Sequence, residues 1–122
     1  GGSIHKKVFI KKIKKNVYQK FGSSLVPMGD SACITFDGIE VVLNSNRCQT
    51  FSTDLFSKLG INISKKNIII VKSTNHFYKS FKPYVSEIIY ASIDGIYPNN
   101  PKKNKYFKLK RKIWPIYSNP HL

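Results

Sequence analysis

The sequence predicts a single α/β domain with a mixed α+β arrangement. In it, β-hairpins precede a strand-helix-strand unit. Three observations predict it. Two β-rich runs flank Asp37-Gly38, two short helical patterns follow Gln49, and continuous β-branched runs stand on either side of the second pattern. A chain of 122 residues is long enough for one hydrophobic core and too short for several. We therefore expect a single mixed sheet with two or three short helices.

Residues 1–30 are expected to form strands and a loop. From Ile4 to Phe21 apolar residues are interspersed with lysines at mostly strand-like intervals, and Lys14-Lys15-Asn16 is typical of a turn. Residues 22–30 bring two glycines and a proline in quick succession, which is typical of a loop. These features predict an exposed hairpin, or a bent pair of edge strands, followed by a loop.

The predicted core begins with a hairpin in residues 31–93. The β-rich runs SACITF and IEVVLNS are joined by Asp37-Gly38, a dipeptide suited to the positive φ angles of a two-residue turn. After Gln49, Ser52 or Thr53 can cap a helix that Gly60 ends.

A strand-helix-strand unit is expected next. The runs NIIIVKS and EIIYASI are typical of buried strands, and a helix capped by Ser73 or Thr74 lies between them. A right-handed crossover would make the two strands parallel neighbours. Residues 94–122 hold four prolines and a basic run, so we expect an irregular basic tail.

Charge and composition narrow the function classes. The net charge of +15 suggests nucleic-acid binding, yet Arg47 and Arg111 are the only arginines among the basic residues, and Arg is the side chain that reads bases and phosphates best. Lys, Asn and Ile are over-used together, as in an AT-biased coding sequence. These details argue against a nucleic-acid partner, although a small basic nucleic-acid-binding module remains the alternative.

The sequence also bears on the location of the protein and on the redox state of its two cysteines. No apolar run is long enough to cross a bilayer, and no signal-peptide pattern opens the chain, so we expect no membrane partner. Cys33 and Cys48 lack the spacing of a zinc site or a disulfide scaffold. We expect both to be reduced residues of the core, in a cytoplasmic protein.

Several segments resemble the motifs of one known family in their order and spacing. EVVLNSNRCQ resembles a strand followed by Ser, two Arg, any residue and Gln. Ser45, Arg47 and Gln49 match this motif, while Asn46 stands where the first Arg is usual. FSTDLFSKLGI resembles a short helix that ends in Leu-Gly-Ile.

The second half of the resemblance follows at the expected distance. IIIVKSTNHFYKSF is similar to a strand leading to Lys-Ser, two residues and His-Phe, which Lys72, Ser73, His76 and Phe77 match. Asp94-Gly95 takes the place of an Asp-Ala-Pro-Gly turn without its Ala-Pro, and residues 112–115 resemble a closing basic-Ile-Trp-Pro. Together the segments resemble the C-terminal domain of the MlrC (microcystinase C) family.

The resemblance implies a zinc metallopeptidase-like hydrolase, whose best known member is linked to cleavage of linearised microcystin, a cyclic-peptide toxin. It places the zinc in an N-terminal catalytic domain that is absent here, and makes that domain this chain's partner. The residues themselves agree, since a catalytic zinc needs about three ligands and the only histidines are His5, His76 and His121. No HExxH, GxSxG or P-loop motif occurs. We expect no cofactor in this chain and no activity from it alone.

The candidate site residues are Ser45, Arg47, Gln49, Lys72, Ser73 and His76. Both groups follow predicted strand ends, where open α/β sheets collect ligands, and we hypothesise that they meet at one edge of the sheet. Arg47 could clamp a peptide carboxylate, Lys72 could add a charge, and His76 could act as an auxiliary proton donor. The alternatives are hydrogen bonds at a domain interface for Arg47 and Gln49, and a capping or core role for His76.

Three functions therefore stay open: an accessory, substrate-cleft domain of an MlrC-like metallopeptidase that hydrolyses peptide or amide bonds, a nucleic-acid-binding module, and a free-standing interaction domain. The first is the leading hypothesis because it alone uses the ordered motifs.

Overall fold

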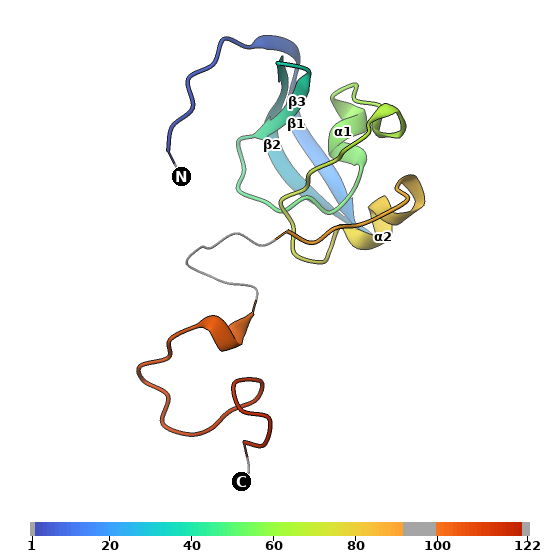
Figure 1. The fold of residues 1–122 in the computed structure, drawn as a ribbon. Coiled ribbons are helices and arrows are strands. Elements are labelled where there is room, and N and C mark those ends of the chain that lie inside the picture. The colour runs from blue at the N-terminus through green and yellow to red at the C-terminus, as the bar shows by residue number, and fades with distance from the viewer. Residues whose placement is uncertain (1, 92–99, 121–122) are drawn as a thin grey trace. The chain divides into compact units, whose positions relative to one another are not determined.

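Figure 1 shows the computed structural model of the chain, which describes residues 2–91 and 100–120. The chain divides into two compact units, residues 1–88 and residues 89–122, and each is described by itself. The first unit holds the strands and helices α1 and α2, while the described part of the second holds the 3-10 helix η3 (Pro101–Lys103). That both units form a single domain stays a prediction.

An antiparallel three-stranded sheet is the frame of the first unit. Strands β1 (Phe9–Phe21), β2 (Ser24–Phe36) and β3 (Ile39–Asn44) are neighbours in the sheet in the order in which they occur in the chain. Asp37 and Gly38 have φ angles of 49° and 77°, and Phe36 pairs with Ile39 across them. The predicted two-residue turn is confirmed, and the sheet with its short helices confirms the mixed α+β class.

The prediction for residues 1–30 is wrong in two places. β1 continues through Lys14-Lys15-Asn16 because an irregularity in the register absorbs these residues, with Asn16 at a φ of 50°. Residues 22–30 are not a loop, since Gly22 and Ser23 form a tight turn and β2 starts directly after it. The proline and the second glycine mark a further register shift within β2 instead of a break in the chain.

Helix α1 (Asp54–Lys58) confirms the first helical pattern and contacts β1. Thr53 occupies its N-cap position. Gly60 follows the helix with a φ of 77°, a conformation that residues with a Cβ rarely adopt. Leu55 and Leu59 point into the core, where they are 3% and 0% exposed.

Helix α2 (Tyr78–Phe81) is shorter than predicted and begins later than Ser73 or Thr74. The backbone N–H of Thr74 is bonded to the side chain of Gln49, and bends and turns at residues 74–77 precede the helix. The 3-10 helices η1 (Ile63–Lys65) and η2 (Lys82–Tyr84) precede and follow α2. Phe81 is buried and contacts Phe56 of α1 at a ring distance of 5.9 Å.

A small hydrophobic core lies between the sheet and the helices. Cys33 is fully buried there as a free thiol, and Cys48 is half-buried against the same cluster, also free. Burial raises the pKa of the Cys33 thiol, which keeps it protonated and unreactive. The buried members of the core are Val17, Met28, Cys33, Leu55, Leu59 and Ile61.

The predicted strand-helix-strand unit is wrong where the structure describes it. Residues 67–73 and 87–91 form no strand, and Ile68 and Ile70 are 80% and 87% exposed. A β-prone run becomes a strand only where another strand pairs with it, and the sheet of the first unit ends at β3. The end of the second predicted strand, residues 92–93, and the Asp94-Gly95 turn lie outside the described residues.

Within residues 2–91 and 100–120, no helix has the length and hydrophobicity needed to cross a bilayer. At the start of η1 the backbone N–H of Ser64 donates to the side chain of Asn62, which satisfies one of the free N–H groups at a helix start.

Gly29 provides a test of the packing between β2 and the segment after β3. It has a φ of +71°, and a Cβ added there would lie 2.1 Å from Ser45 Oγ. We predict that Gly29→Ala lowers the free energy of unfolding by about 2–3 kcal/mol, because strain and a displaced hydrogen bond add together.

Gly22→Ala is the matched control for this measurement. Gly22 also has positive φ, at +61°, but nothing lies within 4 Å of an added Cβ, so we expect a loss of only about 1 kcal/mol. Urea unfolding of both variants checks the difference. Equal losses of unfolding free energy in the two variants would show that the contact with Ser45 does not contribute to stability.

Candidate functional site

The buried side chain of Gln19 fixes the path of the chain after β3. Gln19 is fully buried in β1. Its Nε2 donates to the carbonyl oxygen of Gln49 at 2.7 Å, and its Oε1 accepts from the backbone N–H of Phe51 at 2.8 Å and of Ser52 at 3.3 Å. One amide therefore satisfies three backbone groups of the segment 49–52, which is the way buried polar groups are made compatible with a core.

Ser45 and Asn46 attach the beginning of the same segment to β2. The backbone N–H of Ser45 donates to the carbonyl of Asp30 at 2.9 Å, and Ser45 Oγ accepts from the N–H of Asp30 at 2.9 Å. Asn46 donates from its backbone to Met28 and from its side chain to Pro27. Ser45 thus has a structural role at the end of the hairpin in addition to its place in the motif.

Gln49 joins the two groups of predicted site residues. Its Oε1 accepts from Ser73 Oγ at 3.3 Å, from the N–H of Thr74 at 3.3 Å and from Thr74 Oγ1 at 3.4 Å. Segments 49–52 and 73–76, which are more than 20 residues apart, therefore lie side by side. The structure brings Gln49 and Ser73 into direct contact.

His76 lies at the same place against two aromatic rings. Its ring meets Phe21 at 5.2 Å and Phe51 at 5.7 Å, both edge to face, and Phe21 and Phe51 are 4.5 Å apart. These are favourable aromatic geometries. His76 remains exposed. We call the residues of this region the Gln49 cluster: Phe21, Gln49, Phe51, Ser73, Thr74 and His76.

Arg47 and Lys72 are both exposed. Each lies in sequence beside the cluster, two residues before Gln49 and one residue before Ser73. Neither makes a hydrogen bond or ion pair with another residue in the described part of the chain. Two cationic side chains next to the cluster are thus available to an anion from outside.

The carboxylates of the first unit are mostly occupied by structural contacts. Asp30 accepts from the N–H of Asn16, and Asp54 accepts from the N–H of Lys20. Asp37 pairs with Lys6 at the exposed hairpin turn. These carboxylates therefore stabilise strands and turns, and the Gln49 cluster contains no carboxylate that could act as a general base.

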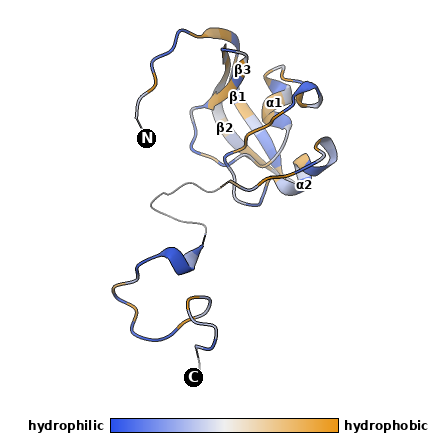
Figure 2. Cartoon of the chain, in the orientation of Figure 1, coloured by the Kyte–Doolittle hydropathy of each residue, from blue (hydrophilic) through white to orange (hydrophobic). Residues whose placement is uncertain are grey.

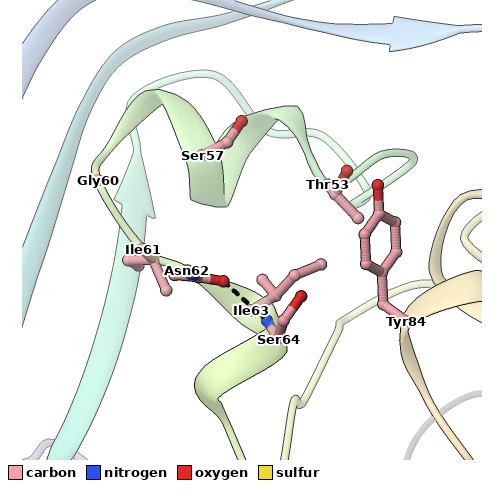
Figure 3. Close-up of a pocket in the computed structure, with 8 residues that line it drawn as sticks. All are labelled: Thr53, Ser57, Gly60, Ile61, Asn62, Ile63, Ser64 and Tyr84. Carbon is pink, nitrogen blue, oxygen red and sulfur yellow. Dashed lines mark hydrogen bonds between the residues drawn. The ribbon is translucent and has the colours of Figure 1, made fainter.

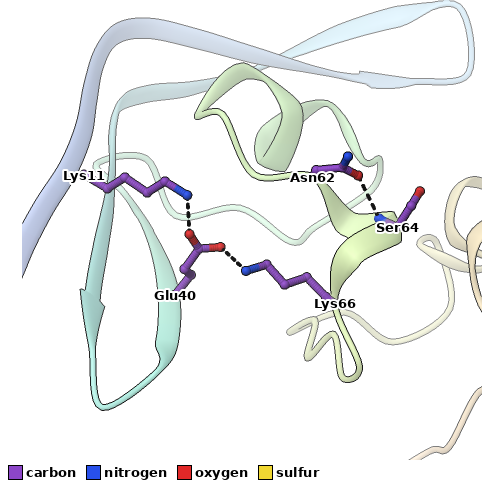
Figure 4. Close-up of polar contacts among 5 residues, drawn as sticks. All are labelled: Lys11, Glu40, Asn62, Ser64 and Lys66. Carbon is purple, nitrogen blue, oxygen red and sulfur yellow. Dashed lines mark hydrogen bonds and ion pairs between the residues drawn. The ribbon is translucent and has the colours of Figure 1, made fainter.

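Glu40 of β3 lies between two lysines (Figure 4). Oε1 pairs with Lys11 of β1, and Oε2 lies 2.6 Å from Nζ of Lys66, which follows η1. The hydrogen bond from Lys11, and then that from Lys66, hold the pKa of Glu40 below its ordinary value. The same hydrogen bond raises the pKa of Lys11. Glu40 thereby connects the sheet to the segment after α1.

A shallow pocket of about 380 Å³ lies between α1, η1 and η2 (Figure 3). Its lining offers the hydroxyl groups of Thr53, Ser57, Ser64 and Tyr84 and the amide of Asn62. It contains no charged side chain, so it has no means of activating a nucleophile. None of the predicted site residues lines it.

Among the residues that the structure describes, no group of three or more His, Cys, Asp or Glu side chains could hold a metal ion. His121 lies outside the described residues. The family resemblance places the zinc in the N-terminal domain and implies no metal ligands in this chain. The Gln49 cluster and its neighbours have the chemistry of binding, with two cations, hydroxyl groups and aromatic rings, and one exposed imidazole that could move a proton.

Gln19, Phe21 and Phe51 belong to this region but were missed as candidates. Gln19 lies in a lysine-rich strand, and nothing in the local sequence distinguishes a buried glutamine from an exposed one there. The signal that could have identified it is the alternation of Val17 and Gln19 on one face of β1, since both are buried.

The family model described as "MlrC C-terminus" matches residues 1–108 of the sequence. Microcystinase C from Sphingomonas sp is 26% identical over 104 residues, which cover 85% of this chain and 20% of that protein. The chain thus spans about a fifth of the length of this relative. The basic-Ile-Trp-Pro motif at 112–115 lies beyond the matched residues.

Gln19→Leu tests whether the buried amide positions the segment 49–52. We predict a loss of about 2–4 kcal/mol in the free energy of unfolding, because the carbonyl of Gln49 and two N–H groups lose their partner. Gln49→Ala, which removes an exposed amide, should cost less than about 1 kcal/mol. Amide exchange at Phe51 and Ser52 should accelerate in Gln19→Leu, and unchanged exchange would contradict the role of Gln19.

Glu40→Gln tests the ion pairs through their dependence on pH. A carboxylate whose pKa is lowered by folding stabilises the protein above its unfolded pKa of about 4.3, and this contribution is lost as the pH falls through the folded pKa. We predict that Glu40→Gln is less stable than the unchanged protein by up to about 1 kcal/mol at pH 7.

The difference between Glu40→Gln and the unchanged protein should shrink towards zero in acid. Glu87→Gln, at an exposed carboxylate of the same unit, is the control for the loss of one negative charge. Urea unfolding between pH 7 and acid measures both. A difference that stays constant with pH would show that the two lysines do not stabilise the ionised form of Glu40.

Proposed function

The chain belongs to the MlrC family as its C-terminal domain, and on that premise we propose that it forms one side of the substrate cleft of a metallopeptidase-like hydrolase. The N-terminal catalytic domain of the same protein is then its partner. By the family resemblance, the catalytic zinc belongs to that domain. The family match and the fact that the matched residues make up only 20% of the relative support this arrangement.

The observation that carries the proposal is the contact between Gln49 and the segment 73–76. It joins the motif residues that follow the hairpin to those that precede α2. A contact between two sequence motifs far apart in the chain is what a shared binding surface requires. The exposure of His76, Arg47 and Lys72 around it leaves their polar atoms available to a ligand.

The roles follow from the chemistry of each side chain. Arg47 would bind a peptide carboxylate with its planar guanidinium, and Lys72 would add a point charge. Phe21 and Phe51 meet the ring of His76 edge to face, and the exposed imidazole could donate a hydrogen bond to the substrate. Ser45, Gln49 and Ser73 build the surface and do not react.

We expect this chain alone to be inactive. The contribution of the Gln49 cluster is to bind and orient a peptide, with His76 as an auxiliary proton donor, for chemistry performed by the partner domain. The hydrolysed bond is an amide, by the family's resemblance to peptidases.

Lys72→Ala in the full-length protein tests the cleft directly. We predict that kcat/KM for a linear peptide with a free carboxylate falls on the order of tenfold, the effect of losing about 1.4 kcal/mol from one exposed charge contact. The same peptide with its carboxylates amidated should show a much smaller change, because it offers no anion to Lys72.

Lys79→Ala is the matched control, since Lys79 is an exposed lysine of α2 outside the cluster. It should leave kcat/KM unchanged for both peptides. An unchanged kcat/KM for Lys72→Ala would remove the substrate-binding role from this surface and leave the alternative of a domain interface.

A further inference from the structure

The two faces of the sheet differ in polarity in an unusual way. On β3, alternate residues point to opposite faces. Val42 packs against the hydrophobic core, and Glu40, on the same face, points towards Lys66 (Figure 4). The face covered by α1 therefore carries Glu40, Val42 and Asn44, whereas the opposite face carries Ile39, Val41 and Leu43. The uncovered face is the more apolar of the two.

Strands β1 and β2 continue this apolar face. Ile34 pairs with Ile10 on one side and with Val41 on the other. Ala32 likewise pairs with Ile13 and Leu43, and Phe36 pairs with Ile39. Every position in these rows is apolar. We call this surface the outer sheet face: Ile10, Ile13, Ala32, Ile34, Phe36, Ile39, Val41 and Leu43.

The outer sheet face is largely open to solvent in this structure. Ile10, Ile13, Ile39 and Leu43 are 56%, 64%, 53% and 50% exposed. In Figure 2 the strands of the sheet carry hydrophobic segments, coloured orange, among more hydrophilic ones. An antiparallel sheet with one solvated face normally alternates between apolar and polar residues, and contiguous exposed apolar surface marks an interaction site.

We propose that the outer sheet face is the surface on which the N-terminal catalytic domain of the same polypeptide docks. The inference rests on the proposed function in so far as that domain exists, and goes beyond it by assigning the interface. About four fifths of the relative lies outside the matched region, which is enough polypeptide to form a domain that covers this face. Ile10 and Ile13 belong to β1, the first strand, which any preceding polypeptide reaches first.

Charge argues for this occupant over a second copy of the chain. The net charge of the chain is +15. Two copies that met through the outer sheet face would bring two strongly basic chains together at a cost in repulsion. Lys11 and Lys12 of β1 lie on the opposite face, towards Glu40 and Gly60, so the docking surface of the partner domain is apolar where it meets the outer sheet face.

Cysteine labelling in the full-length protein tests the proposal. Ile13→Cys and Leu43→Cys place a thiol at the centre of the outer sheet face, on two different strands, so failure of one variant to fold leaves the other. Lys65→Cys, at an exposed residue of η1, is the control. Labelling by a maleimide is measured at each introduced position by peptide mass analysis, with labelling in urea as the fully accessible reference.

We expect the thiols introduced by Ile13→Cys and Leu43→Cys to label more slowly than that of Lys65→Cys by on the order of tenfold or more, at every protein concentration. Labelling as fast as that of the control would overturn the proposal. Protection that disappears on dilution would assign the face to a second copy, and protection that disappears when residues 89–122 are deleted would assign it to the C-terminal unit. Because labelling does not depend on turnover, this result is separate from that of Lys72→Ala.

Discussion

The amide of Gln19 holds the segment 49–52 against β1, and the rest of the first unit is arranged around that contact. The amide forms hydrogen bonds with three backbone groups of this segment, which would otherwise lack partners over the core. With this segment fixed, Gln49 can reach the residues before α2, and Phe51 can stack beside Phe21. A single buried polar side chain thus connects the stability of the fold to the geometry of the candidate site.

The distribution of apolar residues explains why this unit has so small a core. The face of the sheet that packs on α1 contributes few apolar side chains to the core, because Glu40 and Asn44 also lie on it. The opposite face is apolar and exposed. An apolar sheet face is buried only when another layer of structure packs against it. The open apolar face is therefore consistent with a domain that its parent protein completes, as is a match that spans a fifth of the relative.

Local signals in the sequence predicted the features that depend on local structure. The Asp37-Gly38 turn and the helix ended by Gly60 follow from residues that tolerate positive φ. The long β1 was not predicted, because a bulge at Asn16 has the same composition as a turn. The run at 67–73 was misassigned because its β propensity is real, but strand formation depends on a partner strand that the local sequence does not reveal. The contact between Gln49 and Ser73 agrees with the hypothesis that the two groups meet, although the strand end from which it was inferred is absent at residues 67–73. The clamp by Gln19 depends on tertiary contacts alone.

Whether the Gln49 cluster faces the substrate can be decided by hydrogen exchange of the full-length protein, with and without a tightly bound, uncleaved peptide. If it does, exchange should slow in segments 45–52 and 72–77 when the peptide is bound, with no change in the turn at Asp37-Gly38. Exchange that is unaffected in both segments while the peptide is bound would contradict a substrate-facing cluster.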